Sequence, residues 1–423
     1  MNVLLIGGGG REHALAWKLS QSPLVQELTC APGNAGIAQV AACVDVKADD
    51  IVGLLALIER GGYDFVVVGP EQPLALGIVD EVEARGVKVF GPTQAAAQLE
   101  SSKSFTKEFC KRYDIPTADY GVFTDIKKAK AFLKTMSPPY VLKADGLAAG
   151  KGVVIPETLK EAETELDEFF SGKFGQASTK VVIEEFMTGQ EVSFFAISDG
   201  KTAFPLIGAQ DHKRAFDGDK GPNTGGMGAY SPAPVFTQKQ LEIVMEKIVQ
   251  PTVYGMAKDG HAFKGVLFAG LMMTPEGPKL IEYNARFGDP ECQVIMRRLQ
   301  SDLMEILIAA EAGTLDKTKA PAWFDEAVVN VVLAAKGYPS NYDKGTVIRG
   351  LDKANALEGV VVFHAGTKVN DQGEVLANGG RVLNITSQAS SLERAVATAY
   401  KAIDECVDWP DGFCRRDIAH HAL

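Results

Sequence analysis

The sequence has few cysteines and no pattern typical of a zinc site, a membrane span or a signal sequence. Its 423 residues include six cysteines, and none of them forms a CxxC or Cys/His pair with the spacing of a zinc site. No apolar run approaches the length that spans a bilayer, and Met1 leads into a strand pattern rather than a signal sequence. Because free thiols are typical of the reducing cytosol, we expect a soluble, cytoplasmic protein with no membrane partner.

Positive charge is also in deficit. The formal net charge is -11, whereas nucleic-acid grooves and anionic membranes bind surfaces with concentrated positive charge. We therefore expect small-molecule substrates and no nucleic-acid partner, although a local basic pocket for phosphates is compatible with this charge. The composition, 46% hydrophobic and 23% charged, is typical of globular proteins, and the length predicts about three domains.

The N-terminal glycine turn lacks part of the dinucleotide-binding pattern. An apolar strand at residues 3–6, glycines at 7–10 and a helix at 11–19 predict a strand, turn and helix. The helix N-terminus suits a phosphate, but His13 stands where the third glycine of a dinucleotide fingerprint belongs. A phosphate site and a purely structural tight turn both remain open. Further strands at 63–68 and 87–90, with a helix at 76–85, predict an open, mostly parallel sheet.

A glycine-rich loop with a lysine near each end joins two predicted strands. It runs from Lys143 to Gly152 and is not a Walker A loop, because only three residues separate Gly146 from Gly150 and no Ser or Thr follows Lys151. Such a loop can close over a triphosphate, donating backbone N–H groups and lysine charge. The alternative is a mobile hairpin with solvated lysines.

The segment KLIEYNARFGDPE, residues 279–291, begins as a strand. Since residues two apart share a strand face, Glu282, Asn284 and Arg286 are expected to point the same way. Carboxylate and amide oxygens suit Mg²⁺, and an arginine beside them could hold an anion. The alternative is an edge strand whose solvent face is polar.

Between these two segments lie a strand at 180–186, Glu191, and a charged stretch followed by glycines at 211–228. Glu191 could bind ribose hydroxyls or be an exposed turn residue, and long glycine-rich inserts are commonly functional. We expect one long helix from Asp289 to about Ala312, and a strand-rich unit from residue 327. The predicted domains are 1–100, a central domain of 101–123 and 189–324, a lid of 124–188, and a C-terminal domain of 325–423.

The order of these signals resembles the ATP-grasp superfamily of carboxylate-amine ligases. Five segments in particular, GGGGREHALAWKL, GPEQPLALG, KADGLAAGKGV, NTGGMGAYSP and EYNARFGDPE, are similar to the glycinamide ribonucleotide synthetase family across essentially the whole chain. The resemblance implies a multidomain α/β and α+β fold with an N-terminal open parallel domain, a mobile lid, a central metal-bearing sheet and a small C-terminal domain. It also implies an ATP-dependent joining of glycine to 5-phosphoribosylamine in purine biosynthesis, through a glycyl phosphate.

The resemblance also implies roles for individual residues. Glu282 and Asn284 would bind Mg²⁺ or Mn²⁺, and Arg286, Asp211 and Lys213 are the catalytic candidates. Arg286 would hold the glycine carboxylate or an intermediate's phosphate. ATP contacts are expected from two lysines, the glycine loop, an adenine hinge and a ribose carboxylate: Lys103, Lys143, Gly146, Gly150, Lys151, Gly152, Glu184, Glu185, Phe186 and Glu191. Substrate contacts, with the 5-phosphate at the N-terminal turn, are expected from Gly8, Gly9, Gly10, Arg11, Gly225, Gly226 and Arg286.

Three other functions make different predictions. A dehydrogenase would need the missing third glycine and would show a nicotinamide-dependent absorbance change. A catalytically dead nucleotide-binding protein would lack Glu282 or Asn284, and both are present. A ligase of the same superfamily for another acid would release ADP with that acid instead of glycine. We expect a monomer or a weak homodimer.

Overall fold

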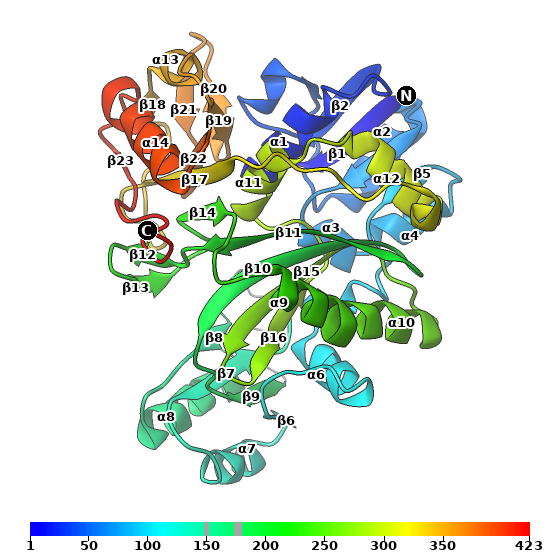
Figure 1. Cartoon of the computed structure of the whole chain (residues 1–423), viewed down its shortest axis with the longest axis vertical. Helices are drawn as coiled ribbons and strands as arrows, with labels where there is room; N and C mark the ends of the chain where they lie inside the picture. The colour runs from blue at the N-terminus through cyan, green and yellow to red at the C-terminus, as the bar shows by residue number, and fades with distance from the viewer. Residues whose placement is uncertain (148–151, 173–179) are drawn as a thin grey trace.

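The computed structural model describes residues 1–147, 152–172 and 180–423. Three main sheets organise these residues (Figure 1). In this view the N-terminal and C-terminal parts lie next to each other above strands β10 (Gln190–Asp199) and β11 (Ala203–Asp211). The segment around helices α7 (Ile126–Leu133) and α8 (Leu159–Phe170) lies below them.

A five-stranded parallel sheet with strand order β3-β2-β1-β4-β5 forms the N-terminal part, as the sequence predicted. The central strand β1 is almost wholly buried and pairs in parallel with β2 and β4, so the turn after β1 lies at the carboxyl edge of the sheet. The strands are β1 (Asn2–Gly7), β2 (Glu27–Pro32), β3 (Ala42–Cys43), β4 (Phe65–Val68) and β5 (Lys88–Phe90). The helices are α1 (Gly10–Leu19), α2 (Ile51–Gly61), α3 (Glu71–Ala75) and α4 (Ile78–Glu83).

A four-stranded antiparallel sheet, ordered β6-β9-β7-β8, carries the lysine-flanked loop. Two amphipathic helices cover it with Leu133, Leu166 and Phe169, which are fully buried. Its elements are β6 (Tyr120–Phe123), α7 (Ile126–Leu133), β7 (Tyr140–Ala144), β8 (Val153–Val154), α8 (Leu159–Phe170) and β9 (Val181–Glu185). The chain enters this sheet through α5 (Gln98–Ser101) and α6 (Lys103–Arg112).

The central sheet has nine strands and includes strands from the C-terminal unit. β14 pairs with β17, so the sheet runs without a break through residues that the sequence had suggested as separate units. Its strands are β10 (Gln190–Asp199), β11 (Ala203–Asp211), β14 (Gly228–Ser231), β15 (Lys264–Thr274), β16 (Gly277–Asn284), β17 (Ala327–Ala335), β19 (Val360–His364), β22 (Arg381–Ala389) and β23 (Gly412–Phe413). A hairpin of β12 (Arg214–Phe216) and β13 (Lys220–Asn223) and a small sheet of β18 (Val347–Ile348), β20 (Thr367–Val369) and β21 (Val375–Ala377) flank it.

The prediction of one helix from Asp289 to Ala312 is wrong. Two helices, α11 (Glu291–Arg298) and α12 (Leu303–Glu311), occupy this stretch. The chain is extended at Leu299, and Asp302 caps the second helix by accepting from the Met304 amide at 2.8 Å. By contrast, the helix expected at 76–85 forms as the shorter α4, which starts after Gly77 with its φ of +85.

The remaining helices pack on the central sheet. Two of them, α9 (Gln238–Val244) and α10 (Gln250–Lys258), are joined by a π turn at Met245–Val249. Further helices are α13 (Leu351–Asn355) and α14 (Leu392–Cys406). One buried cluster joins Leu15 of α1 to Met304 of α12 and Phe363 of β19, so the first sheet is packed firmly onto the central one. No helix in the described residues has the length and apolarity to cross a membrane.

Candidate active site

β16 carries Glu282 and Asn284 two residues apart near its end. Burial alone would raise the pKa of Glu282. The charges of Lys143, Lys213 and Lys103 act more strongly in the other direction and hold that pKa below its usual range. Glu282 is therefore an ionised carboxylate among cations, which is the environment that a triphosphate with a divalent ion would enter.

Lys143 links the four-stranded sheet β6-β9-β7-β8, called the lid sheet below, to the central sheet. It belongs to β7, yet its Nζ lies 3.4 Å from the carbonyl oxygen of Ile281 in β16. The same Nζ is 2.9 Å from Glu184 Oε2, and Lys107 Nζ is 3.2 Å from that oxygen. The other oxygen, Glu184 Oε1, is buried without a hydrogen-bond partner in the described residues. One oxygen of the Glu184 carboxylate thus binds two buried lysines, and its other oxygen can still accept a hydrogen bond.

The residue after β7 is anchored by the start of α6. The Asp145 carboxylate accepts from the Ser104 amide at 3.1 Å and from the Ser104 hydroxyl at 2.6 Å. Lys103, the first residue of α6, donates to the carbonyl of Gly146 at 3.1 Å. Gly146 has φ +147, a conformation that L side chains rarely adopt. These contacts fix where the glycine loop leaves its sheet.

β10 and β11 bring three charged residues together beside Glu282. Glu191, a strand residue and not a turn residue, forms an ion pair with Lys213. Burial raises the pKa of Asp211 to about 7; Lys213 opposes this shift, while Glu291 and Glu191 add to it. Asp211 is the carboxylate here whose proton affinity suits exchange near neutral pH.

Arg286 lies in the bend that follows β16 and not in the strand itself, so the predicted strand alternation does not extend to it. Its Nη2 nevertheless donates to Asn284 Oδ1 at 3.1 Å. The guanidinium is also 3.1 Å from Glu71 and 2.8 Å from Glu100, and it donates to the carbonyl of Phe287. Two carboxylates thus already balance the charge of Arg286, and any substrate anion would join or displace them.

Glu12, an acidic residue of α1, holds the N-terminal glycine turn. The Gly9 amide donates to Glu12 Oε2 at 2.7 Å, and Arg11 Nε donates to Glu12 Oε1 at 2.6 Å. A Cβ on Gly8 would lie 2.5 Å from the Gly33 carbonyl oxygen, so only glycine permits this approach of the two loops. The turn is a tight packing site, and a phosphate there would compete with Glu12 for the amides.

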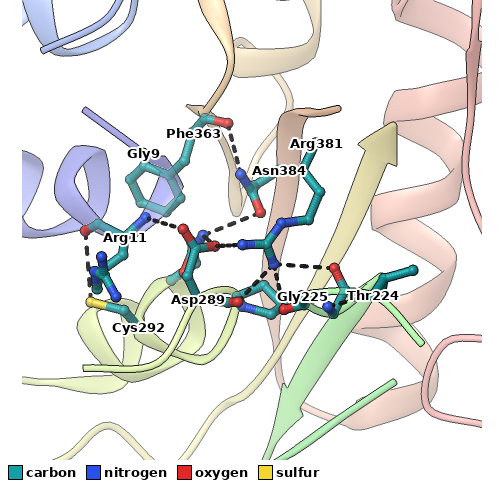
Figure 2. Close-up of polar contacts among 12 residues, drawn as sticks. Gly9, Arg11, Thr224, Gly225, Asp289, Cys292, Phe363, Arg381 and Asn384 are labelled. Atoms are coloured by element: carbon teal, nitrogen blue, oxygen red, sulfur yellow. Dashed lines mark hydrogen bonds and ion pairs between the residues drawn. The ribbon is translucent and has the colours of Figure 1, made fainter. Parts of the chain in front are cut away.

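Asp289 connects the N-terminal turn to the second glycine cluster and to β22 (Figure 2). Asp289 Oδ2 accepts from the Arg11 amide at 3.2 Å. Arg381 of β22 lies 3.5 Å from Asp289 Oδ1 and donates to the carbonyls of Gly225 at 2.6 Å and Gly226 at 3.3 Å. The segment after β16 thus holds three separate parts of the chain together.

The expected adenine hinge borders a cavity of about 1240 Å³. Glu185 and Phe186 line this cavity with Asp119, Tyr120 and Pro139. Phe186 is exposed at 43% of its surface. Because Glu282 and Lys143 do not line it, the cavity extends the hinge side of the site and is not its charged centre.

The structure gathers most of the expected residues but not all of them in one place. The charges of Lys103, Lys143 and Lys213 act on Glu282. Glu191 and Asp211 act in turn on Lys213. The glycine turns at 8–11 and 225–226 meet at Asp289, further along the same segment. Gly150 and Lys151 lie outside the described residues, whereas the Gly152 carbonyl accepts from the Ala144 amide at 2.8 Å.

Sequence reasoning gave no role to four charged residues that complete these networks. They are Glu71, Glu100, Lys107 and Arg381. Glu71 follows a strand end and could have been found from that position alone. Lys107 lies one helical turn after Lys103 on α6. Arg381 and Glu100 carry no local signal, because their partners are far away in the sequence.

Family comparisons agree with this architecture. Residues 101–292 match the phosphoribosylglycinamide synthetase ATP-grasp (A) domain, residues 1–100 match the N domain of the same family, and residues 328–421 match its C domain. A phosphoribosylamine–glycine ligase from Brucella melitensis is 56% identical over 423 residues, covering 100% of this chain and 98% of the relative.

Solved structures give the same picture. A phosphoribosylamine–glycine ligase from Thermotoga maritima superposes with a TM-score of 0.84 at 33% identity, covering 99% of this chain and 100% of that one. A biotin carboxylase from Campylobacter jejuni shares the fold at 15% identity, with a TM-score of 0.77 over 97% of this chain and 93% of the other.

An open parallel domain, a lid sheet and a central sheet that face each other across lysines and a carboxylate define an ATP-grasp ligase. Within that class, the chain belongs to the phosphoribosylglycinamide synthetase family.

Proposed function

We propose that the protein joins glycine to 5-phosphoribosylamine at the expense of ATP, giving glycinamide ribonucleotide, ADP and phosphate in purine biosynthesis. One observation carries the proposal: a ligase named for this reaction is 56% identical over the full length of the chain. A ligase for another carboxylic acid is not favoured, because the similarity extends over all three family domains and not only the nucleotide-binding one.

The chemistry follows from the poor reactivity of a carboxylate toward an amine. A glycine carboxylate oxygen takes the γ-phosphoryl group of ATP and ADP leaves, which gives glycyl phosphate. The ribosylamine nitrogen then attacks the glycyl carbonyl carbon, phosphate leaves, and the nitrogen loses a proton. Such steps depend on positioning and charge neutralisation more than on a protein nucleophile.

We infer that the residues around Glu282 hold the phosphates. Lys143 and Lys103 would contact phosphate oxygens, together with the loop that contains Gly146, Gly150, Lys151 and Gly152. Glu282 and Asn284 would hold Mg²⁺ or Mn²⁺, and they fit this role because Glu282 is ionised and Asn284 offers an amide oxygen. A divalent ion there supplies charge neutralisation for the phosphates.

The nucleotide's other end is assigned to β9 and β10. We infer that adenine lies against Glu184, Glu185 and Phe186, and that Glu191 binds the ribose hydroxyls. The unpartnered Glu184 Oε1 supports this assignment, since a buried carboxylate oxygen requires a donor and an adenine amino group could provide one. Glu191 would then exchange part of its contact with Lys213 for the ribose.

We infer three catalytic groups that act on glycine and on the attacking amine: Arg286, Asp211 and Lys213. Arg286 would bind the glycine carboxylate or the acyl phosphate. Asp211, with a pKa of about 7, suits acceptance of the proton that the attacking amine loses. The substrate phosphate and sugar would lie between the two glycine turns: Gly8, Gly9, Gly10 and Arg11 on one side, Gly225 and Gly226 on the other.

We also propose the domain limits stated from the sequence: 1–100, 101–123 with 189–324, 124–188, and 325–423. The same proposal includes action in the cytoplasm as a monomer or weak homodimer on small molecules, with no nucleic-acid partner. The negative net charge supports the last point.

The test is an assay of ADP formation with glycine and freshly generated phosphoribosylamine, omitting each substrate in turn. We expect ADP release to require both substrates. Glycine with ¹⁸O in its carboxylate should deliver one labelled oxygen to the released phosphate, because the acyl phosphate is cleaved at its C–O bond. ADP release that does not depend on glycine would contradict the proposed reaction, and unlabelled phosphate would contradict the intermediate.

A further inference from the structure

Three histidines and an aspartate form a cluster that includes His212, the residue between Asp211 and Lys213. His212 follows β11, Asp219 lies in the turn between β12 and β13, and His420 and His421 lie near residue 423. One ligand atom from each of the three histidines lies within 4.8 Å of the other two. No step of the proposed reaction uses this cluster, and residues about 200 positions apart in the sequence build it.

The spacing of the outer atoms suits a metal ion. His421 Nε2 is 3.0 Å from Asp219 Oδ2, and His420 Nε2 is 3.3 Å from the same oxygen. Two atoms bound to a tetrahedral zinc ion at about 2.0 Å are themselves about 3.3 Å apart. Two imidazoles and a carboxylate can thus share one ion with little movement.

The hydrogen bonds of His420 set its tautomer. Its Nδ1 lies 2.8 Å from the carbonyl oxygen of Asp417, which can only accept, so Nδ1 carries the hydrogen. The lone pair of Nε2 in the neutral ring therefore faces the Asp219 carboxylate. Two acceptors at 3.3 Å need a cation or an added proton between them. A backbone carbonyl that orients the far nitrogen is also the usual support of a metal-binding histidine.

His212 is the buried histidine of the cluster. Its side chain is 1% exposed, and its Nε2 accepts from the Ala419 amide at 2.9 Å. Nδ1 consequently carries the hydrogen, and this donor has no hydrogen-bond partner among the described residues. The nearest carboxylate oxygen, Asp219 Oδ1, is 3.8 Å away. A small shift of Asp219 would satisfy His212 and steer the carboxylate that faces the other two histidines.

We propose that Asp219, His420 and His421 bind one divalent transition-metal ion of the zinc type, with His212 as the supporting donor to Asp219. Imidazole nitrogens favour zinc over magnesium or calcium, which prefer oxygen ligands only. Arg415 lies 2.8 Å from Asp219 Oδ1 and so leaves Oδ2 free for the ion. The ion would clamp residues 417–421 to the β12–β13 hairpin, next to the glycine cluster that contains Gly225.

The test uses the untagged, metal-stripped full chain, because a polyhistidine tag would bind zinc itself. Zn²⁺ is titrated by calorimetry in excess Mg²⁺, without nucleotide. We expect one Zn²⁺ per chain, and binding weakened about tenfold or more in His420→Ala and His421→Ala. His261→Ala is the matched control, since it removes one histidine outside the cluster and should bind as the wild type does.

Two further measurements keep the test independent of folding and of activity. Zn²⁺ should raise the unfolding temperature of the wild type and of His261→Ala, but not of His421→Ala. Asp219→Asn should also lose the binding, and Asn tolerates the φ of +53 at this position. Wild-type protein that binds no stoichiometric zinc, or cluster variants that bind like the control, would overturn the proposal; the histidine–aspartate contacts would then be satisfied by a proton.

Discussion

Single residues in the candidate active site are arranged so that each charge has an opposite. Glu282 faces three lysines, Glu184 binds two, and Arg286 lies between two carboxylates. Buried charges are tolerated only when they are paired in this way. Removing one member therefore affects function through the groups that it leaves uncompensated.

Glu282→Gln keeps the shape of the side chain and removes its charge. We expect turnover to fall about a hundredfold or more, because a metal ligand with its charge contributes several kcal/mol of transition-state stabilisation. The matched control is Glu305→Gln, which changes an exposed residue of α12 and should leave turnover unchanged. Wild-type turnover of the Glu282 variant across a magnesium titration would contradict the metal role.

The raised pKa of Asp211 predicts that kcat/KM depends on pH. Burial raises its pKa to about 7, so the carboxyl group is protonated below that pH and accepts a proton only above it. We expect kcat/KM to rise with pH through about 7, since this ratio reports the free enzyme. Asp211→Asn should lower kcat/KM by about 10² to 10⁴ and abolish the acidic limb. A variant that keeps the limb at the same midpoint would assign it to another group.

At the scale of elements, the break between α11 and α12 depends on one cap. Asp302 accepts from the Met304 amide, and its other oxygen accepts from the Ser22 hydroxyl at 2.7 Å. This contact to the N-terminal part is possible only because the chain leaves the helix at Leu299. The break thus connects the start of α12 to the turn that follows α1.

Asp302→Ala should destabilise α12 locally by about 1 to 2 kcal/mol, the usual cost of losing a helix cap. Hydrogen exchange of the α12 amides should accelerate about 5- to 30-fold. Glu305→Ala, on the exposed face of the same helix, serves as the control and should change exchange little. Unchanged protection in Asp302→Ala would show that packing alone maintains the start of α12.

At the scale of the molecule, the central sheet is continuous from β16 to the C-terminal unit. All residues of β17 are buried, and four residue pairs join it to β14. The C-terminal unit therefore supplies part of the central core and holds the glycine cluster through Arg381.

A fragment of residues 1–324 should not fold as a stable monomer, because it exposes the edge of β14 and the core face that β17 covers. We expect aggregation in size-exclusion chromatography and no cooperative unfolding transition. Co-expression with residues 325–423 should restore a soluble species and a cooperative unfolding transition. This control would show that the fragment fails because it lacks the C-terminal unit. A soluble 1–324 monomer with a native-like transition would contradict this dependence.

Local structure and family membership follow from the sequence alone. Strands at 3–6, 63–68 and 180–186, both glycine turns and the Glu282/Asn284 alternation follow from side-chain period and from residues that tolerate tight turns. These features depend on neighbours in the chain, which a sequence displays directly.

Which distant residues meet is visible only in the folded chain. The two carboxylates on Arg286, the buried lysine pair on Glu184, the sheet shared with β17 and the histidines around Asp219 all join segments far apart in the chain. The break at Leu299 is likewise not visible in the sequence, because the apolar pattern continues at helical spacing across it. Asp302 starts the new helix there and also accepts from Ser22, which is distant in the chain. Packing chooses such partners, and no local pattern encodes them.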